Sequence, residues 1–92
     1  MIYNNFFIFN FHEYRNVYNE EKHSEQEYLI ALGKRIKEIR LLKKISQTEI
    51  AYRCNFDKSN LNTIESGKRN PTIISLLKIA KALEVEIIEL IV

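Results

Sequence analysis

Apolar positions from residue 29 onward recur with the spacing of amphipathic helices. Leu32, Ile36 and Ile39 are four and three residues apart, with basic and acidic residues between them, which predicts a first helix over Glu27–Lys44. Further helices are expected over residues 47–54, 58–66 and 73–83, and a short one from about residue 86. The pattern therefore predicts an all-α domain of five helices.

Short polar residues separate the predicted helices. Ser46 and Glu49 have the spacing of a capping box, in which each side chain bonds the backbone amide of the other. Asp57 and Thr72 can cap the third and fourth helices. Asn55 tolerates a left-handed backbone, so it suits the tight turn between the second and third helices. Helices joined by so short a turn cross steeply, as in a helix-turn-helix.

Length and composition allow a single domain. The chain has 92 residues, of which 46% are hydrophobic and 28% charged, an ordinary globular balance. We divide it into an N-terminal extension, residues 1–26, and a folded domain, residues 27–92. Aromatic residues in the extension alternate only partly with asparagine, so its structure is uncertain. It is an added strand, an interaction arm, a poorly ordered segment or sequence upstream of the natural start.

The net charge of +2 hides an asymmetry along the chain. Residues 1–31 carry two Lys and Arg against five Glu, which gives 2 − 5 = −3. Residues 32–92 carry twelve Lys and Arg against seven acids, which gives 12 − 7 = +5. The basic part suits a nucleic acid, although a basic solvated face has the same composition.

The sequence offers little reactive chemistry. Cys54 is the only cysteine and is expected to be a small core hydrophobe rather than a redox switch, and the two histidines are far apart. We find no Ser/His/Asp set, metal-ligand spacing or glycine-rich phosphate loop, so we expect no metal, no cofactor and no enzyme. The start lacks a basic leader, and no stretch approaches the roughly 18 apolar residues of a membrane span. We expect a cytoplasmic protein.

The stretch over residues 45–71, ISQTEIAYRCNFDKSNLNTIESGKRNP, resembles the Cro and phage-repressor (Xre-like) helix-turn-helix family. The resemblance extends from about Leu32 to Leu90. It includes Ser-Gln at the start of the second helix, Ile-Glu-x-Gly-x-Arg-x-Pro at 64–71 and Leu-x-Lys-Ile-Ala-Lys-Ala-Leu at 76–83. It implies a five-helix lambda-repressor-like domain that binds palindromic operator DNA as a symmetric homodimer.

Under this resemblance the third helix is the recognition helix, whose first residues face base edges in the major groove. The candidate base readers are Lys58, Ser59, Asn60, Asn62 and Thr63. Their donors and acceptors suit direct readout of bases. The candidate phosphate ligands are Gln47, at the start of the second helix, and the loop residues Lys68, Arg69 and Asn70. Solvated polar side chains are the alternative interpretation for both sets.

The resemblance also pairs Arg40 with Glu65 in a partly buried structural salt bridge. Three residues depart from the family pattern. Asn55 stands where glycine is usual, Glu84 replaces a common helix-ending glycine, and Glu86 replaces a common capping residue. The last two leave the start of the fifth helix uncertain.

The C-terminal segment contains more apolar residues than one short helix can bury against its own domain. We expect part of it to form a homodimer contact, although a closing helix on a monomer is the alternative. The expected contact residues are Ile87, Ile88, Leu90 and Ile91. A symmetric dimer would place two recognition helices about 34 Å apart on a palindromic operator.

The resemblance and the composition predict a sequence-specific double-stranded DNA-binding transcriptional regulator, either a repressor or an autoregulator. An antitoxin-type protein-interaction module that also binds DNA is the alternative. In that alternative a protein partner docks on the N-terminal arm. The small size of the domain favours regulation through protein concentration over a small-molecule effector.

Overall fold

The computed structural model describes residues 24–91, in which there are five helices and no strand. They are α2 (Glu25–Leu42), α3 (Gln47–Cys54), α4 (Lys58–Glu65), α5 (Ile73–Leu83) and α6 (Ile88–Ile91). The expected all-α, five-helix fold is confirmed. The interaction arm considered for the N-terminal extension falls on residues outside the described part of the chain. None of the described helices is long and apolar enough to cross a membrane.

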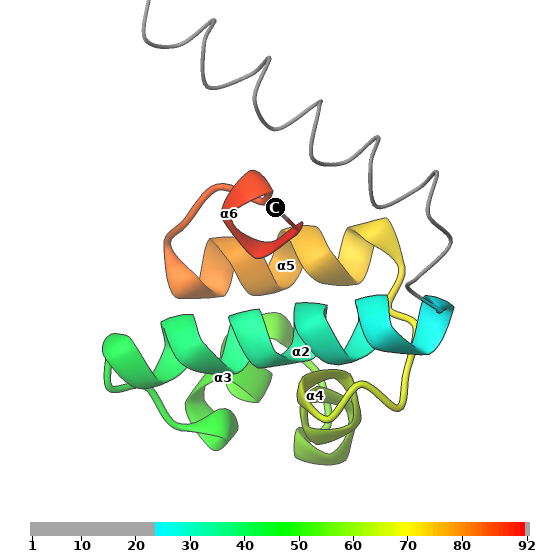
Figure 1. Ribbon diagram of the computed structural model, residues 1–92. Helices are drawn as coiled ribbons and strands as arrows, with labels where there is room; N and C mark the ends of the chain where they lie inside the picture. The colour runs from blue at the N-terminus through cyan, green and yellow to red at the C-terminus, as the bar shows by residue number, and fades with distance from the viewer. Residues whose placement is uncertain (1–23, 92) are drawn as a thin grey trace, which may run out of the picture.

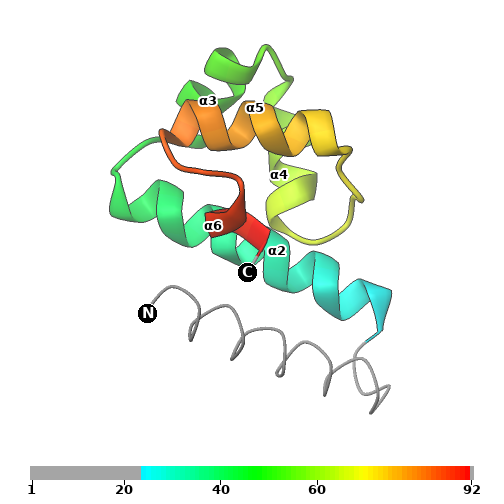
Figure 2. The same ribbon diagram turned by 90° about the horizontal axis from the view of Figure 1, so that it is seen from above.

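The helices pack as two long rods with shorter helices on either side. In Figure 1, α2 and α5 lie across the view and α4 is seen nearly end-on, so α4 crosses α2 steeply. Helix α4 packs against both α3 and α2, α3 packs against α5, and α6 packs against α2. Figure 2 shows α6 in the space between α2 and α5. The pair α3 and α4 therefore projects from one side of the domain.

Every helix contributes at least one fully buried side chain to a single core. The largest of these are Ile36, Ile50, Leu61, Ile79, Leu83 and Leu90. Burying each such side chain stabilises the fold by about 1.5–3 kcal/mol before entropy is counted. The short helices α3, α4 and α6 thus depend on packing, because isolated helices of their length are marginal in water.

Most helix boundaries agree with the sequence pattern. Helix α2 begins two residues earlier than expected, at Glu25, because the Ser24 hydroxyl accepts a hydrogen bond from the Glu27 amide. It also ends earlier, at Leu42, and α4 ends at Glu65. Helix α6 begins at Ile88, two residues after the expected start.

The helix caps are only partly as expected. Thr72 accepts from the Ser75 amide at 3.1 Å, and Ser46 accepts from the Glu49 amide at 3.0 Å. The Glu49 carboxylate does not complete the capping box, because it accepts from Arg53 Nε at 2.9 Å instead. Asp57 occupies the N-cap position of α4 with an extended backbone. The expected capping by its side chain is wrong, because that side chain makes no capping hydrogen bond.

A residue with a left-handed backbone follows each of the first four described helices, one or two positions after its last residue. These residues are Lys44 (φ 59°), Asn55 (φ 57°), Gly67 (φ 76°) and Glu84 (φ 60°). The next amide then bonds a carbonyl five residues back: Ile45 to Arg40, Phe56 to Ala51, Lys68 to Thr63, and Val85 to Ala80. This is the Schellman arrangement. The prediction for Asn55 is confirmed, and Glu84 adopts the conformation that glycine usually supplies.

Gly33, which the sequence pattern does not single out, lies where α2 meets the end of α4. A Cβ atom at Gly33 would lie 2.3 Å from the Ile64 carbonyl oxygen and 2.5 Å from the Glu65 carbonyl oxygen. Both atoms belong to the backbone of α4, so no side-chain rotation can relieve the clash. The absence of a side chain therefore sets how closely α2 approaches α4.

Substituting Gly33→Ala is expected to lower the free energy of unfolding by about 1–3 kcal/mol through overpacking. The loss should appear even though alanine favours helices by about 1 kcal/mol over glycine. Urea unfolding of both proteins measures the change. The exposed neighbour gives a control, because Lys34→Ala should change stability by no more than about 0.5 kcal/mol. An equal midpoint for wild type and Gly33→Ala would contradict the close approach.

Candidate nucleic-acid interface

Helix α4 presents a polar side away from the core. Leu61, Ile64 and Glu65 are buried on its inner side. On the outer side Lys58, Ser59 and Asn62 are exposed. The other two predicted base readers, Asn60 and Thr63, are half-buried. The structure thus brings the five predicted readers onto one short helix but does not make them equally accessible.

Two of these residues are constrained by contacts within the domain. The Thr63 hydroxyl donates to the Asn60 carbonyl oxygen at 2.8 Å, so it retains only acceptor capacity for a ligand. Asn60 lines a hollow of about 120 Å³ together with Arg69, Asn70 and the start of α5. Its side chain lies on the edge of α4 nearest the loop that follows.

That loop is basic and exposed. Lys68, Arg69 and Asn70 are all exposed directly after the left-handed Gly67. Within residues 24–91 neither Lys68 nor Arg69 is recorded in an ion pair. The loop therefore offers two uncompensated positive charges beside the polar side of α4.

Arg40 and Glu65 form the buried salt bridge that the resemblance implies. Arg40 Nε donates to Glu65 Oε2 at 2.7 Å, and Arg40 Nη2 donates to Oε1 at 3.1 Å. The side chains are only 8% and 3% exposed, respectively. Arg40 Nη1 also donates to the Ile45 carbonyl at 2.9 Å. One guanidinium thus holds the end of α4 and the turn before α3 in fixed positions.

Gln47 is engaged by this same ion pair. Its Nε2 donates to Glu65 Oε1 at 2.9 Å and to Asn62 Oδ1 at 3.4 Å. The sequence analysis expected Gln47 only as a phosphate ligand and missed its link to Glu65. No sequence signal identifies that link, because the residues are 18 positions apart and lie on different helices.

The start of α3 still offers amides to an anion. The Glu49 amide donates to the Ser46 hydroxyl, and the Ile50 amide donates to the Ser46 carbonyl. The amides of Gln47 and Thr48 precede these and have no acceptor within the helix. An N-terminus of this kind attracts phosphate through its free amides and its dipole.

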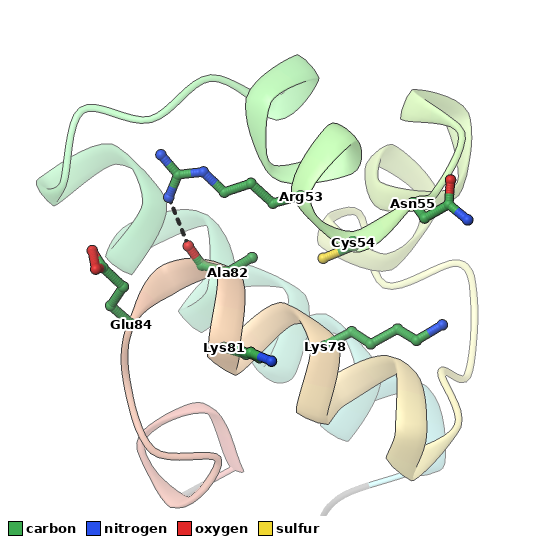
Figure 3. A pocket seen from close by; sticks show the side chains of 7 residues that line it. All are labelled: Arg53, Cys54, Asn55, Lys78, Lys81, Ala82 and Glu84. Carbon is green, nitrogen blue, oxygen red and sulfur yellow. Dashed lines mark hydrogen bonds between the residues drawn. The ribbon is translucent and has the colours of Figure 1, made fainter.

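A second hollow, of about 560 Å³, lies at the opposite end of α3. Figure 3 shows Arg53 above it, donating to the Ala82 carbonyl, with Lys78 and Lys81 projecting from α5. Burial raises the pKa of the Cys54 thiol, while the charge of Lys78 acts in the opposite direction. The thiol is therefore neutral and only slightly exposed, in agreement with a core role. In the described part of the chain no cluster of potential metal ligands is found.

The C-terminal helix requires one correction. Leu90 is 1% exposed and belongs to the core of its own domain, so it is not available as a dimer contact. Arg35 Nε donates to the Glu89 carbonyl at 2.9 Å and holds α6 against α2, which turns Leu90 inward. Ile88 and Ile91 are 59% and 55% exposed, and Ile87 is half-buried against the core.

The first turns of α5 carry apolar side chains that do not reach the core. Ile73 and Leu77 are 59% and 46% exposed. Ile74, beside them, is 57% exposed. The first turns of α5 therefore add apolar surface to the domain. Helical periodicity alone does not distinguish these positions from core positions.

Comparisons with known proteins agree on the family. The family model described as helix-turn-helix (HTH_3) matches residues 36–90. An HTH-type transcriptional regulator of Sinorhizobium fredii, y4dJ, is 37% identical over 60 residues, which are 65% of this chain and 78% of that protein.

Solved structures extend the likeness to three dimensions. The restriction-modification controller protein C.AhdI from Aeromonas hydrophila is 37% identical with a TM-score of 0.66, over 67% of this chain and 94% of that chain. The controller protein C.Esp1396I was solved as a tetramer in complex with its natural 35 base-pair operator. It is 42% identical with a TM-score of 0.61, over 64% of this chain and 78% of that chain.

Removing one partner of the buried ion pair should be far more costly than removing a surface partner. We expect Glu65→Ala to lower the free energy of unfolding by about 3–5 kcal/mol, because it leaves the Arg40 charge buried and unpaired. The double variant Arg40→Met with Glu65→Leu should lose less than the sum of its single variants. Urea unfolding checks both statements.

The matched control is Glu38→Ala, which removes an exposed pair with Arg35 at 3.9 Å. Its expected cost is about 0–1 kcal/mol. A similar cost for Glu38→Ala and Glu65→Ala would show that the buried pair has no special role in the fold.

Proposed function

The chain belongs to the helix-turn-helix family of DNA-binding transcriptional regulators, and from this premise we propose that it is a dimeric repressor or autoregulator that reads a palindromic operator with α4. The proposal includes no catalytic step. It assigns the protein to the cytoplasm, where it would meet its operator.

The observation that carries the proposal is the surface formed by α4, the start of α3 and the loop after α4. It combines exposed hydrogen-bonding side chains on a short helix, free amides at a helix N-terminus and two uncompensated cations. Base edges need the first feature, whereas phosphates need the other two. All three occur on segments adjacent in space, since α4 packs against α3.

Within this proposal the residues divide by chemistry. Lys58 can donate to guanine acceptors and Ser59 can donate or accept, and both are exposed in the first turn of α4. Asn60 has an amide that can pair with adenine through two atoms. Asn62 and Thr63 lie one turn further along. The phosphate ligands are the α3 amides at Gln47 and the loop residues Lys68, Arg69 and Asn70.

The proposed dimer contact is centred on α6. Ile88 and Ile91 are three residues apart on this helix and both are more than half exposed. Neither is needed to fill the core of its own domain. A twofold contact made by these residues, with Ile87 at its edge, buries them and pairs two copies of α4 on one face of the DNA.

Selection of bound sequences from random duplex DNA tests the proposed function. The wild-type protein should enrich a palindrome. Asn60→Ala should bind the winning sequence about 1–3 kcal/mol more weakly, with little change in the dependence of affinity on salt. Lys68→Ala should instead reduce the slope of log affinity against log salt by about 1, with base preference unchanged. Failure of the wild-type protein to enrich any sequence would refute sequence-specific binding.

The dimer is tested separately by introducing charge at α6. We expect Ile88→Glu with Ile91→Glu to sediment as a monomer while retaining the helical circular dichroism of the wild type, because both side chains are exposed in the single chain. Leu42→Glu is the matched control, since Leu42 is 80% exposed at the C-terminal end of α2. If the double variant sediments like the wild-type dimer, α6 is not the contact.

A further inference from the structure

A continuous series of hydrogen bonds leads from the core to the polar side of α4. It begins at the buried Arg40, which donates to Glu65 at 2.7 and 3.1 Å. Gln47 Nε2 donates to Glu65 Oε1 at 2.9 Å and to Asn62 Oδ1 at 3.4 Å. The first two residues are buried, Gln47 is half-buried and Asn62 is exposed. The series therefore ends at the surface assigned to DNA.

The orientation of each side chain in this series follows from the one before it. The ionised carboxylate of Glu65 can only accept, so the Gln47 amide must turn its nitrogen, and not its oxygen, toward Glu65. That nitrogen has two hydrogens, so it can donate to Asn62 Oδ1, 3.4 Å away, as well as to Glu65. Asn62 can meet a donor only with its oxygen. Its own amide nitrogen is then left free to donate elsewhere.

We propose that Asn62 is a specificity-determining residue that offers its amide nitrogen to DNA, and that Arg40, Glu65 and Gln47 are positioning residues that fix this orientation. The inference rests on the proposed function. It goes further by stating which atom of one side chain reads the operator and why.

The fixed orientation restricts the bases that Asn62 can read. An asparagine pairs with adenine by donating to N7 and accepting from N6. The bond from Gln47 holds Oδ1 of Asn62 toward α3, so Oδ1 and Nδ2 do not both face one base edge, as the bidentate pair with adenine requires. A lone donor is favoured most by guanine, which presents two acceptors in the major groove, or by thymine, which presents O4. Adenine presents one acceptor, N7, beside a donor, and cytosine presents a donor, so both are less favoured.

Asn60 is an internal comparison on the same helix. Within residues 24–91 its side-chain amide makes no recorded hydrogen bond, since the Thr63 hydroxyl uses only its backbone carbonyl. Asn60 can therefore turn either amide atom toward a base and pair with adenine. Two asparagines two positions apart are thus expected to have different base preferences, although the residue type is identical.

The series also changes the expected role of Gln47. With its nitrogen committed to Glu65 and Asn62, its side chain presents mainly an oxygen, which cannot accept a hydrogen bond from a phosphate. Phosphate contact at this position then falls to the backbone amides at the start of α3. Loss of the Gln47 side chain should accordingly alter base preference as well as affinity.

The test is selection from random duplex DNA by the full chain and by the variants Asn62→Asp, Asn62→Ala and Asn60→Asp. In each half-site the wild type should favour guanine or thymine at one position. Asn62→Asp replaces the donor with an acceptor and should shift that position to cytosine or adenine by about tenfold. Asn62→Ala should abolish the preference there, and Asn60→Asp should change a different position.

The positioning role is tested by Gln47→Ala, with thermal unfolding followed by circular dichroism to confirm that the variant is folded at the temperature of selection. Freed from Gln47, Asn62 can use both amide atoms, so adenine should become acceptable at the position that Asn62 reads. Lys68→Ala is the control for a phosphate ligand and should leave the preference at every position unchanged.

The failures of the two proposals can be told apart. If the wild type enriches an operator but the Asn62 variants weaken binding with unchanged base preference, Asn62 is a phosphate ligand and the inference is overturned. If Gln47→Ala loses affinity with no new tolerance of adenine, the positioning role is overturned. Failure of the wild type to enrich any sequence refutes the proposed function itself.

Discussion

The buried pair of Arg40 and Glu65 is the contact on which the rest of the domain depends. Its two side chains are 8% and 3% exposed, so both charges lose most of their hydration. The attraction between them does little more than offset that loss, and a well-packed apolar pair can be as stable. An apolar pair cannot make hydrogen bonds, which hold their partners in a fixed orientation. Arg40 bonds α4 and the turn before α3 at once, and so fixes the angle between the two helices.

Backbone geometry allows such short helices to meet around this pair. Gly33 lets α2 approach the last turn of α4, the turn that carries Glu65. The left-handed residues at the ends of α2 to α5 reverse the chain within a few residues and return it toward the core. Ile45, Phe56 and Val85 follow three of these turns and pack on the core, so each turn is held by apolar contact as well as by hydrogen bonds.

The outcome is a domain with two different ends. At one end the start of α3, the outer side of α4 and the basic loop form a surface of donors, acceptors and charge. At the other, Arg53 is occupied by Glu49 and by the Ala82 carbonyl, and Cys54 lies beneath as a neutral thiol (Figure 3). Helix α6 lies on a third side, where Leu90 completes the core and its neighbours remain exposed. The surfaces proposed for recognition and for assembly are therefore separate.

Local sequence signals by themselves determined most of the fold. Apolar periodicity predicted five helices, and Ser46, Thr72 and Asn55 marked their ends, because these effects act within one or two helical turns. The family resemblance added the ion pair of Arg40 and Glu65.

Only the tertiary structure decided the rest. It showed that Leu90 is core and Leu77 is not, that Glu49 bonds Arg53 rather than completing its cap, and that Gly33 is required at a helix crossing. It also showed that the Gln47 amide nitrogen faces Glu65 and donates to Asn62 Oδ1, which orients the Asn62 amide. These features depend on which atoms from distant helices meet, and a side chain with several possible partners takes the one that packing brings within reach.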